Sequence, residues 1–220
     1  MNDFEQFIQQ EVKPKFSGPL HLLSHSMGGA IGLRYIQQHP DTFNKVVFSS
    51  PMWGLEAGPV PKPVAKALVS SLAWVNGLVS DQSPYFIGGK DYNPTKFEDN
   101  VLTHSKVRYQ YFRDIYNKVP QLQLGSVTID WISQSVKGLE TAYNELNKVK
   151  QQVLVLQSGN DTVIDNAAQI QFCDRLKELG NPCAGGSVFV VDGAEHELFI
   201  EQDIMRVKAL NKIIQFLTAQ

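Results

Sequence analysis

Short apolar runs alternate with helical patterns at both ends of this 220-residue chain, and this alternation limits the possible folds more than any other feature. The predicted strands are Pro19 to Leu23, Lys45 to Ser49, Val153 to Gln157 and Ser187 to Val191. Helices are predicted over residues 3–12, 27–40 and 166–179. A last helix has the apolar stripe Ile204, Val207, Leu210, Ile213, Ile214 and Leu217. Apolar strands that are each followed by a helix predict an α/β fold with a mostly parallel sheet covered on both faces.

The middle of the chain, residues 52–150, has a different pattern. It opens with the Pro- and Gly-rich stretch G-L-E-A-G-P-V-P-K-P, and no convincing strand follows. Helices are predicted over Pro63 to Val79, Ser105 to Asn117 and Thr128 to Asn147. We therefore interpret residues 1–51 and 151–220 as the core and residues 52–150 as a helical cap inserted between two strands.

Charge and composition exclude several classes of function. Twenty basic residues against twenty-two acidic ones give a net charge of −2, without the positive excess of a nucleic-acid-binding protein. The apolar stretch Ala67 to Ser80, which carries no charge, is shorter than the ~20 residues that span a bilayer. The acidic N-terminus does not resemble a secretory signal, so a cytoplasmic location is expected. Cys173 and Cys183 are too few for a disulfide framework or a structural zinc site, and are expected to be reduced thiols.

The first predicted strand-to-helix turn, L-H-L-L-S-H-S-M-G-G-A, carries the candidate nucleophile Ser26. A nucleophile elbow places a Ser on a strained turn between a strand and a helix, with small residues two before and two after it. Ser24 and Gly28 occupy those two positions, so Ser24 replaces the usual glycine of G-x-S-x-G.

The order Ser, Asp, His that is typical of such elbows continues downstream. Asp161 lies in S-G-N-D-T-V-I-D after the third predicted strand, and His196 lies in V-D-G-A-E-H-E-L-F after the fourth. All three side chains are therefore expected at the same edge of the sheet, in an arrangement suited to acyl transfer. Asp192 is a second candidate for the acid, and Asp165 or Asn166 is expected to cap the following helix. Structural roles are expected for the remaining histidines, His21, His25, His39 and His104.

These motifs resemble the monoacylglycerol lipase and lysophospholipase branch of the α/β-hydrolases. The segments F-S-S-P-M-W-G-L, N-V-L-T-H-S-K-V-R-Y and P-Q-L-Q-L-G-S-V-T-I-D-W-I-S-Q-S look like the cap of the bacterial inner-membrane-type lysophospholipases. The resemblance implies a serine hydrolase that releases a fatty acid from lysophospholipids, or from monoacylglycerols, without a cofactor or a metal. It implies a catalytic triad of Ser26, Asp161 and His196, with the Met27 backbone amide as an oxyanion donor. It also implies a lipid substrate, and leaves open peripheral contact with the inner membrane.

The resemblance also points to parts of the fold that are expected to be missing. In this fold the nucleophile follows roughly the fifth strand, and a second oxyanion amide comes from an earlier loop. Only twenty-five residues precede Ser26, so the first part of the sheet and the second donor are expected to be absent. An exposed sheet edge would follow, and with it self-association. The alternative to an active esterase is therefore a truncated, catalytically impaired remnant with at most a binding role.

Two segments of the insertion have two interpretations each. Val64 to Val79 is apolar nearly all round, as expected either of a helix packed on the core or of a lid that touches the acyl chain or the bilayer. Lys106 to Arg113, K-V-R-Y-Q-Y-F-R, fits either a solvated amphipathic helix or a contact with a phosphate head group. The sequence alone assigns no substrate-binding residue.

Overall fold

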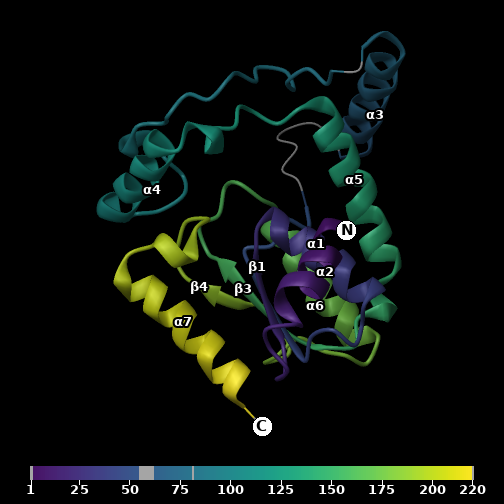
Figure 1. Cartoon of the computed structure of the whole chain (residues 1–220), viewed down its shortest axis with the longest axis vertical. Coiled ribbons are helices and arrows are strands. Elements are labelled where there is room, and N and C mark those ends of the chain that lie inside the picture. The colour runs from purple at the N-terminus through teal and green to yellow at the C-terminus, as the bar shows by residue number, and fades with distance from the viewer. Residues whose placement is uncertain (1, 55–61, 81, 220) are drawn as a thin grey trace.

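A four-stranded parallel sheet forms the centre of the protein (Figure 1). The computed structural model describes residues 2–54, 62–80 and 82–219. The strands follow one another in the order of the sequence: β1 (His21–His25), β2 (Lys45–Ser49), β3 (Gln152–Ser158) and β4 (Phe189–Val191). Because all four are parallel, their carboxyl ends lie at one edge of the sheet. The predicted α/β fold is confirmed.

Helices cover both faces of this sheet, which explains why its central strands are apolar throughout. Helices α2 (Met27–Gln38) and α6 (Asn166–Glu178) pack on one face and α7 (Asp203–Thr218) on the other (Figure 1). Along β3, Val153 and Val155 belong to the core cluster on the α2 side, and Leu154 and Leu156 to the cluster on the α7 side. Alternate residues of one strand therefore build two separate cores.

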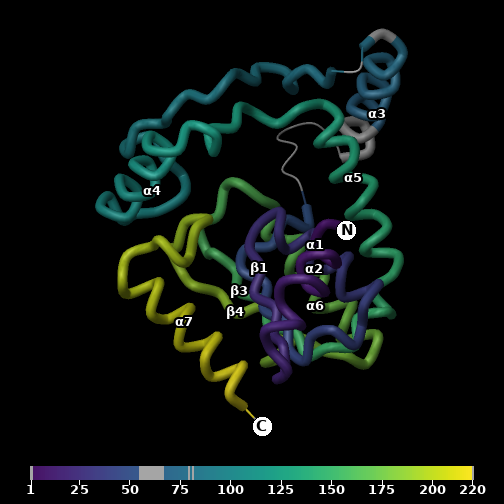
Figure 2. The backbone as a smooth tube through the Cα atoms, viewed as in Figure 1, coloured from purple at the N-terminus to yellow at the C-terminus, as the bar shows by residue number. Residues whose placement is uncertain are grey.

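The segment between β2 and β3 forms the helical insertion. It contains α3 (Lys62–Val79), α4 (Lys106–Lys118) and α5 (Ile129–Asn144), which Figure 2 shows as an arch above the sheet. Short 3-10 turns lie at Phe97–Asp99, Pro120–Leu122 and Leu146–Lys148. Most of the predicted Pro- and Gly-rich stretch lies outside the described residues. The last turn of α5 reaches the core, where Gln37 donates a hydrogen bond to the Ala142 carbonyl oxygen at 2.7 Å.

The N-terminal helix changes from α-helical to π-helical geometry along its length. Helix α1 spans Asn2–Phe7 and continues as a π-helix over Ile8–Val12. The Phe4 and Tyr35 rings lie 4.5 Å apart, and Ile8 is buried in the same core cluster, whereas Phe7 is exposed. In the described part of the chain, no helix is both long enough and apolar enough to cross a bilayer.

The apolar stripe predicted for the last helix is wrong in part. Ile204, Val207 and Ile214 are exposed, and the buried positions of α7 are Ala209, Ile213 and Phe216. The predicted stripe was wider than the contact that α7 makes with the sheet, so residues at its margins remain in solvent.

The expectation of two reduced thiols is also wrong, because Cys173 and Cys183 form a disulfide with a Cα–Cα distance of 5.4 Å. Cys173 lies on the buried face of α6, and Cys183 in the loop that leads to β4. The loop folds back along the helix and brings the two cysteines together. They are ten residues apart in the sequence, and no motif there predicts that they pair.

Candidate active site

Ser26 occupies the sharp turn between β1 and α2. Its φ of 51° and ψ of −122° lie in a region that residues other than glycine rarely adopt. Backbone hydrogen bonds hold this strained turn: Ser26 donates to the Ser49 carbonyl at 3.2 Å, and its own carbonyl accepts from the amides of Gly29 at 2.8 Å and Met52 at 2.9 Å. Strain that the surrounding structure maintains in this way is common at reactive sites.

Close packing behind the turn depends on Gly29 and Gly32 more than on Gly28. A Cβ atom at Gly29 would lie 2.5 Å from Cβ of Pro51, and one at Gly32 would lie 3.0 Å from the Ser24 hydroxyl. A Cβ atom at Gly28 would meet Ser24 at an ordinary 3.8 Å. Gly28, two residues after the nucleophile, therefore has more room for a side chain than the motif predicts. Gly29, three residues after it, has less.

Ser26, His196 and Asp161 form one chain of hydrogen bonds. Nε2 of His196 lies 3.0 Å from Oγ of Ser26, and Nδ1 lies 2.7 Å from Oδ2 of Asp161. The His196 and Asp161 side chains are almost fully buried, at 4% and 0% exposure. The other Asp161 oxygen accepts hydrogen bonds from the backbone amides of Val163 and Ile164. The carboxylate is thus fixed on one side by its own loop and directs its free oxygen at the imidazole.

The loop that carries His196 is attached to its neighbours by polar contacts. Ser158, at the end of β3, donates to the His196 carbonyl at 3.4 Å and lies 2.8 Å from the Ser50 hydroxyl. Ser50 itself has a positive φ of 42°. Asn160 donates to the Glu195 carboxylate at 2.7 Å, which joins the loop after β3 to the loop after β4.

The other candidates from the sequence lie away from this chain of hydrogen bonds. Asp192 is exposed and pairs with Lys208 at 3.1 Å, so the structure places Asp161 rather than Asp192 against the imidazole. Asp165 caps α6 by accepting from the Ala167 amide, as expected. His39 lies near Glu5, and His21 is exposed on β1.

His25 and Glu197 flank His196, and no motif in the sequence marks either of them as functional. The His25 ring lies 4.8 Å from the His196 ring, and its Nε2 lies 3.2 Å from the Glu197 carboxylate. Burial acts to raise the pKa of Glu197, but the hydrogen bond and charge of His25 and the charge of His196 outweigh it, and the pKa is lowered. An ionised carboxylate therefore lies beside the imidazole pair.

The same three side chains could in principle hold a metal ion, because their donor atoms lie within 4.8 Å of one another. The nitrogens of His196 face Ser26 and Asp161, and Nδ1 of His25 lies 3.0 Å from the Ser49 carbonyl oxygen. Binding a metal through His196 would require one of its contacts with Ser26 and Asp161 to break. The arrangement instead suits proton transfer between a hydroxyl group and an imidazole.

Met27 is the first residue of α2, so its backbone N–H belongs to the four that have no acceptor within the helix. This amide follows the nucleophile directly, which is where an elbow supplies one oxyanion donor.

The sequence matches the family described as Serine aminopeptidase, S33 over residues 1–203. The chain belongs to this family. Lysophospholipase L2 of Escherichia coli strain K12 is 32% identical over 216 residues, which cover 98% of this chain and 62% of the relative. The probable lysophospholipase L2 of Haemophilus influenzae is 27% identical over 214 residues, covering 97% of this chain and 64% of that protein. This chain thus spans about three fifths of the length of these curated relatives.

Solved structures show the same fold. The crystal structure of Paleococcus ferrophilus monoacylglycerol lipase superposes with a TM-score of 0.69 at 19% identity, covering 98% of this chain and 74% of that chain. The family match and this fold together confirm the prediction that the chain is an α/β-hydrolase of the lysophospholipase and monoacylglycerol lipase branch.

Proposed function

We propose that this protein is a serine hydrolase that cleaves the acyl ester of lysophospholipids, or of monoacylglycerols, and releases a fatty acid. The hydrogen-bonded chain from Ser26 through His196 to Asp161 carries the proposal. The names of the curated relatives, which are lysophospholipases, support an ester substrate with one acyl chain.

In the proposed reaction, Nε2 of His196 takes the proton from Ser26 as Oγ attacks the ester carbonyl carbon. Asp161 holds the ring in the correct tautomer and stabilises the positive charge that it gains. The Met27 amide donates to the oxygen that becomes negative. His196 then gives the proton to the departing alcohol, which leaves an acyl group on Ser26. Water activated by His196 hydrolyses this acyl-enzyme to the fatty acid and restores the serine.

A fluorophosphonate probe tests the nucleophile, because it labels only serines activated by a base. We expect the 220-residue chain to be labelled, and expect Ser26→Ala and His196→Ala to lose labelling. Ser24→Ala is the matched control, since Ser24 lies two residues away and its buried hydroxyl oxygen has no hydrogen-bond partner in the described part of the chain. Labelling of Ser26→Ala equal to that of the parent chain would contradict the assignment, and so would loss of labelling in Ser24→Ala alone.

We further propose that the insertion is a cap over this site whose helix α3 meets lipid. Trp74 and Leu78 are 68% and 65% exposed, and neighbouring Leu68 and Val75 are also exposed. Among the described residues, α3 packs mainly on α5, which favours the lid interpretation over the packing one. We expect the parent chain to sediment with phospholipid vesicles and Trp74→Glu to do so several-fold less, while a Thr141→Glu control on exposed α5 surface is unchanged. Equal sedimentation of the parent and Trp74→Glu would contradict lipid contact through α3.

A further inference from the structure

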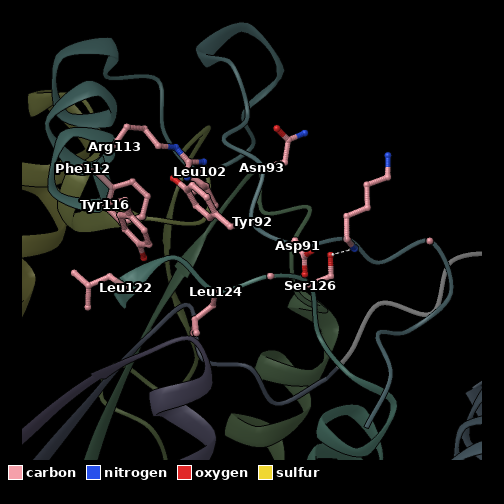
Figure 3. A pocket seen from close by; sticks show the side chains of 13 residues that line it. Asp91, Tyr92, Asn93, Leu102, Phe112, Arg113, Tyr116, Leu122, Leu124 and Ser126 are labelled. Atoms are coloured by element: carbon pink, nitrogen blue, oxygen red, sulfur yellow. Dashed lines mark hydrogen bonds between the residues drawn. The ribbon is translucent and has the colours of Figure 1, made fainter. Parts of the chain in front are cut away.

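A cavity of about 420 Å³ lies within the helical insertion, and none of the residues that line it has a role in the proposed reaction. Three segments and Leu102 line it, and the segments are residues 88–93, helix α4, and residues 122–126. Figure 3 shows Phe112, Arg113 and Tyr116 on one side of the cavity, Tyr92 at its centre, and Asp91 with Ser126 on the other side. Cationic, anionic and aromatic side chains are thus combined in one open site.

Two polar atoms in the wall of this cavity are buried and have no partner in the described part of the chain: Nε of Arg113 and the Tyr92 hydroxyl. Arg113 donates through Nη2 to the Tyr109 hydroxyl at 2.8 Å, and its guanidinium lies over the rings of Tyr109 and Phe112 at 4.8 and 5.3 Å. No carboxylate pairs with it among the residues described. Buried polar groups are rarely left without a partner, and a guanidinium with a free N–H matches a phosphate oxygen.

The cavity also holds groups that suit a positive charge. The rings of Tyr92 and Tyr116 stack at 5.9 Å with an interplanar angle of 2°, which presents an aromatic surface. Asp91 accepts one hydrogen bond, from the Tyr85 hydroxyl at 2.8 Å, and lies in the same wall. Aromatic faces and a carboxylate both attract an ammonium group. A carboxylate in the same cavity as Arg113 disfavours a simple anion and favours a ligand with both charges.

The wall of the cavity is bonded to the loop that carries the proposed base. Leu102 lines the cavity, and its carbonyl oxygen accepts a hydrogen bond from the Glu197 amide at 2.9 Å. Glu197 directly follows His196 in the sequence. In a lysophospholipid the three carbons of glycerol separate the acyl ester from the phosphate, so the proposal requires the head group to lie close to Ser26, and this hydrogen bond connects the wall of the cavity to the loop of the proposed base.

We propose that this cavity binds the zwitterionic head group of a lysophospholipid, with the phosphodiester at Arg113 and Tyr92 and the ammonium at Asp91 and the stacked tyrosines. This inference rests on the proposed function, because it names the substrate class within it. It assigns the binding residues that the sequence left unassigned, and of the two interpretations of Lys106 to Arg113 it selects the head-group contact for Arg113.

Binding can be measured apart from turnover in the Ser26→Ala chain, with glycerophosphocholine as the probe and isothermal titration calorimetry as the readout. We expect Arg113→Gln to weaken binding ~10-fold or more, because it removes a charge-assisted hydrogen bond. Tyr92→Phe should weaken it several-fold. Lys118→Gln is the matched control, an exposed cation on the same helix outside the cavity. Circular dichroism of each variant checks that the fold is retained.

Further ligands distinguish the head group from other occupants. Asp91→Asn should weaken glycerophosphocholine several-fold and should not weaken glycerol 3-phosphate, because only the first carries an ammonium group. The proposal is overturned if Arg113→Gln binds glycerophosphocholine as the parent does. It is also overturned if inorganic phosphate binds as tightly as glycerophosphocholine, or if a monoacylglycerol competes fully for the site, which would make the cavity an acyl-chain site.

A kinetic comparison separates this inference from the proposed function. Arg113→Gln should lower kcat/KM for lysophosphatidylcholine ~10-fold and leave kcat/KM for the monoacylglycerol of the same chain length unchanged. An equal loss on both substrates contradicts a head-group role. If the chain is not labelled by the fluorophosphonate but glycerophosphocholine binding still depends on Arg113, the proposed hydrolase is wrong. The assignment of the cavity then still holds.

Discussion

Gly28 and Gly29 are adjacent in the elbow, yet only Gly29 is packed against another backbone segment. The methyl group of Gly29→Ala would overlap Pro51, whose Cα is 2.9 Å and whose Cβ is 2.5 Å from the added atom. We expect Gly29→Ala to lower the free energy of unfolding by about 1–3 kcal/mol, as overpacking does. Gly28→Ala should be neutral, or stabilising by up to about 1 kcal/mol, since alanine favours the helix. Thermal denaturation of both variants measures this, and an equal loss in both would contradict it.

Asp161 and Asp192 offer a test of the proposed acid. Asp161→Asn keeps the shape of a buried side chain but removes the charge beside His196, so hydrolysis should fall by roughly 10⁴-fold with little change in the fold. Asp192→Asn should match the parent chain, because Asp192 is exposed and meets only Lys208 among the described residues. A chromogenic ester assay compares them. The opposite ranking would assign the acid to the loop after β4.

The residues of the proposed triad could be predicted because each one follows a strand and belongs to a short motif. The carboxyl ends of parallel strands meet at one edge, so the order along the chain was enough to bring Ser26, Asp161 and His196 together. Glu201 and Arg113 could not be found in this way. Glu201 contacts His104, which lies 97 positions earlier, and the unpaired Nε of Arg113 depends on packing within the insertion. Neither property leaves a periodic or local pattern.

At the scale of elements, Glu201 joins the helical insertion to the loop that carries His196. Its side chain is fully buried, and it accepts hydrogen bonds from the amides of Glu195, His104 and Gln202 and from the His104 ring. Arg108 on α4 donates to the Glu201 carbonyl oxygen and pairs with Asp203 at the start of α7. Through its carboxylate and its carbonyl oxygen, Glu201 therefore connects the insertion near the start of α4 to the loop that carries His196.

Replacing this carboxylate by an amide should loosen the connection. In Glu201→Gln an NH₂ group would face backbone N–H groups, so we expect a loss of roughly 2 kcal/mol in the free energy of unfolding. Glu178→Gln is the control, because Glu178 forms an exposed pair with Arg175 and should change stability by less than about 0.5 kcal/mol. Urea denaturation at pH 7 measures both variants, and equal midpoints would contradict the role of Glu201.

The same contact predicts how stability depends on pH. Burial acts to raise the pKa of Glu201, but its hydrogen bonds with Glu195, His104 and Gln202 outweigh burial and lower the pKa. Its stabilising contribution is therefore complete above the unfolded pKa of about 4.3 and is lost as the pH falls through the lower folded value. The difference between the parent and Glu201→Gln should shrink below about pH 4. A difference that grows on acidification would contradict this sign.

Elements buried on both sides were easier to predict than elements with one exposed side. The bounds of β2 match the prediction because every residue from Val46 to Ser49 is buried. The first strand begins two residues later than predicted, and the last is limited to Phe189–Val191. Both lie at the borders of the sheet, where hydrogen-bonded pairing rather than hydropathy decides where a strand ends.

At the scale of the whole molecule, β1 is the border strand of the sheet and pairs with β2 alone among the described residues. Leu23 on this strand is 48% exposed. Since a free parallel edge can pair with another chain, we propose that the 220-residue protein self-associates through β1. Size-exclusion chromatography with light scattering should show dimers or larger species, and Leu23→Lys should shift them toward the monomer. A monodisperse parent monomer at every concentration would contradict the proposal.

Helix α5 has one end in the insertion and the other in the core. Its first turns contact α3, while Leu139 and Ala142 belong to the core cluster and Glu145 pairs with Arg34 at 2.6 Å (Figure 1). The opposite side of the insertion is attached through Glu201. The insertion is thus attached to the core at two places, and moving it away from the sheet would break both attachments. We expect a lipid to enter from the side, between the insertion and the core. The distance between the two attachments, rather than a hinge motion, would then limit the width of a molecule that can reach Ser26.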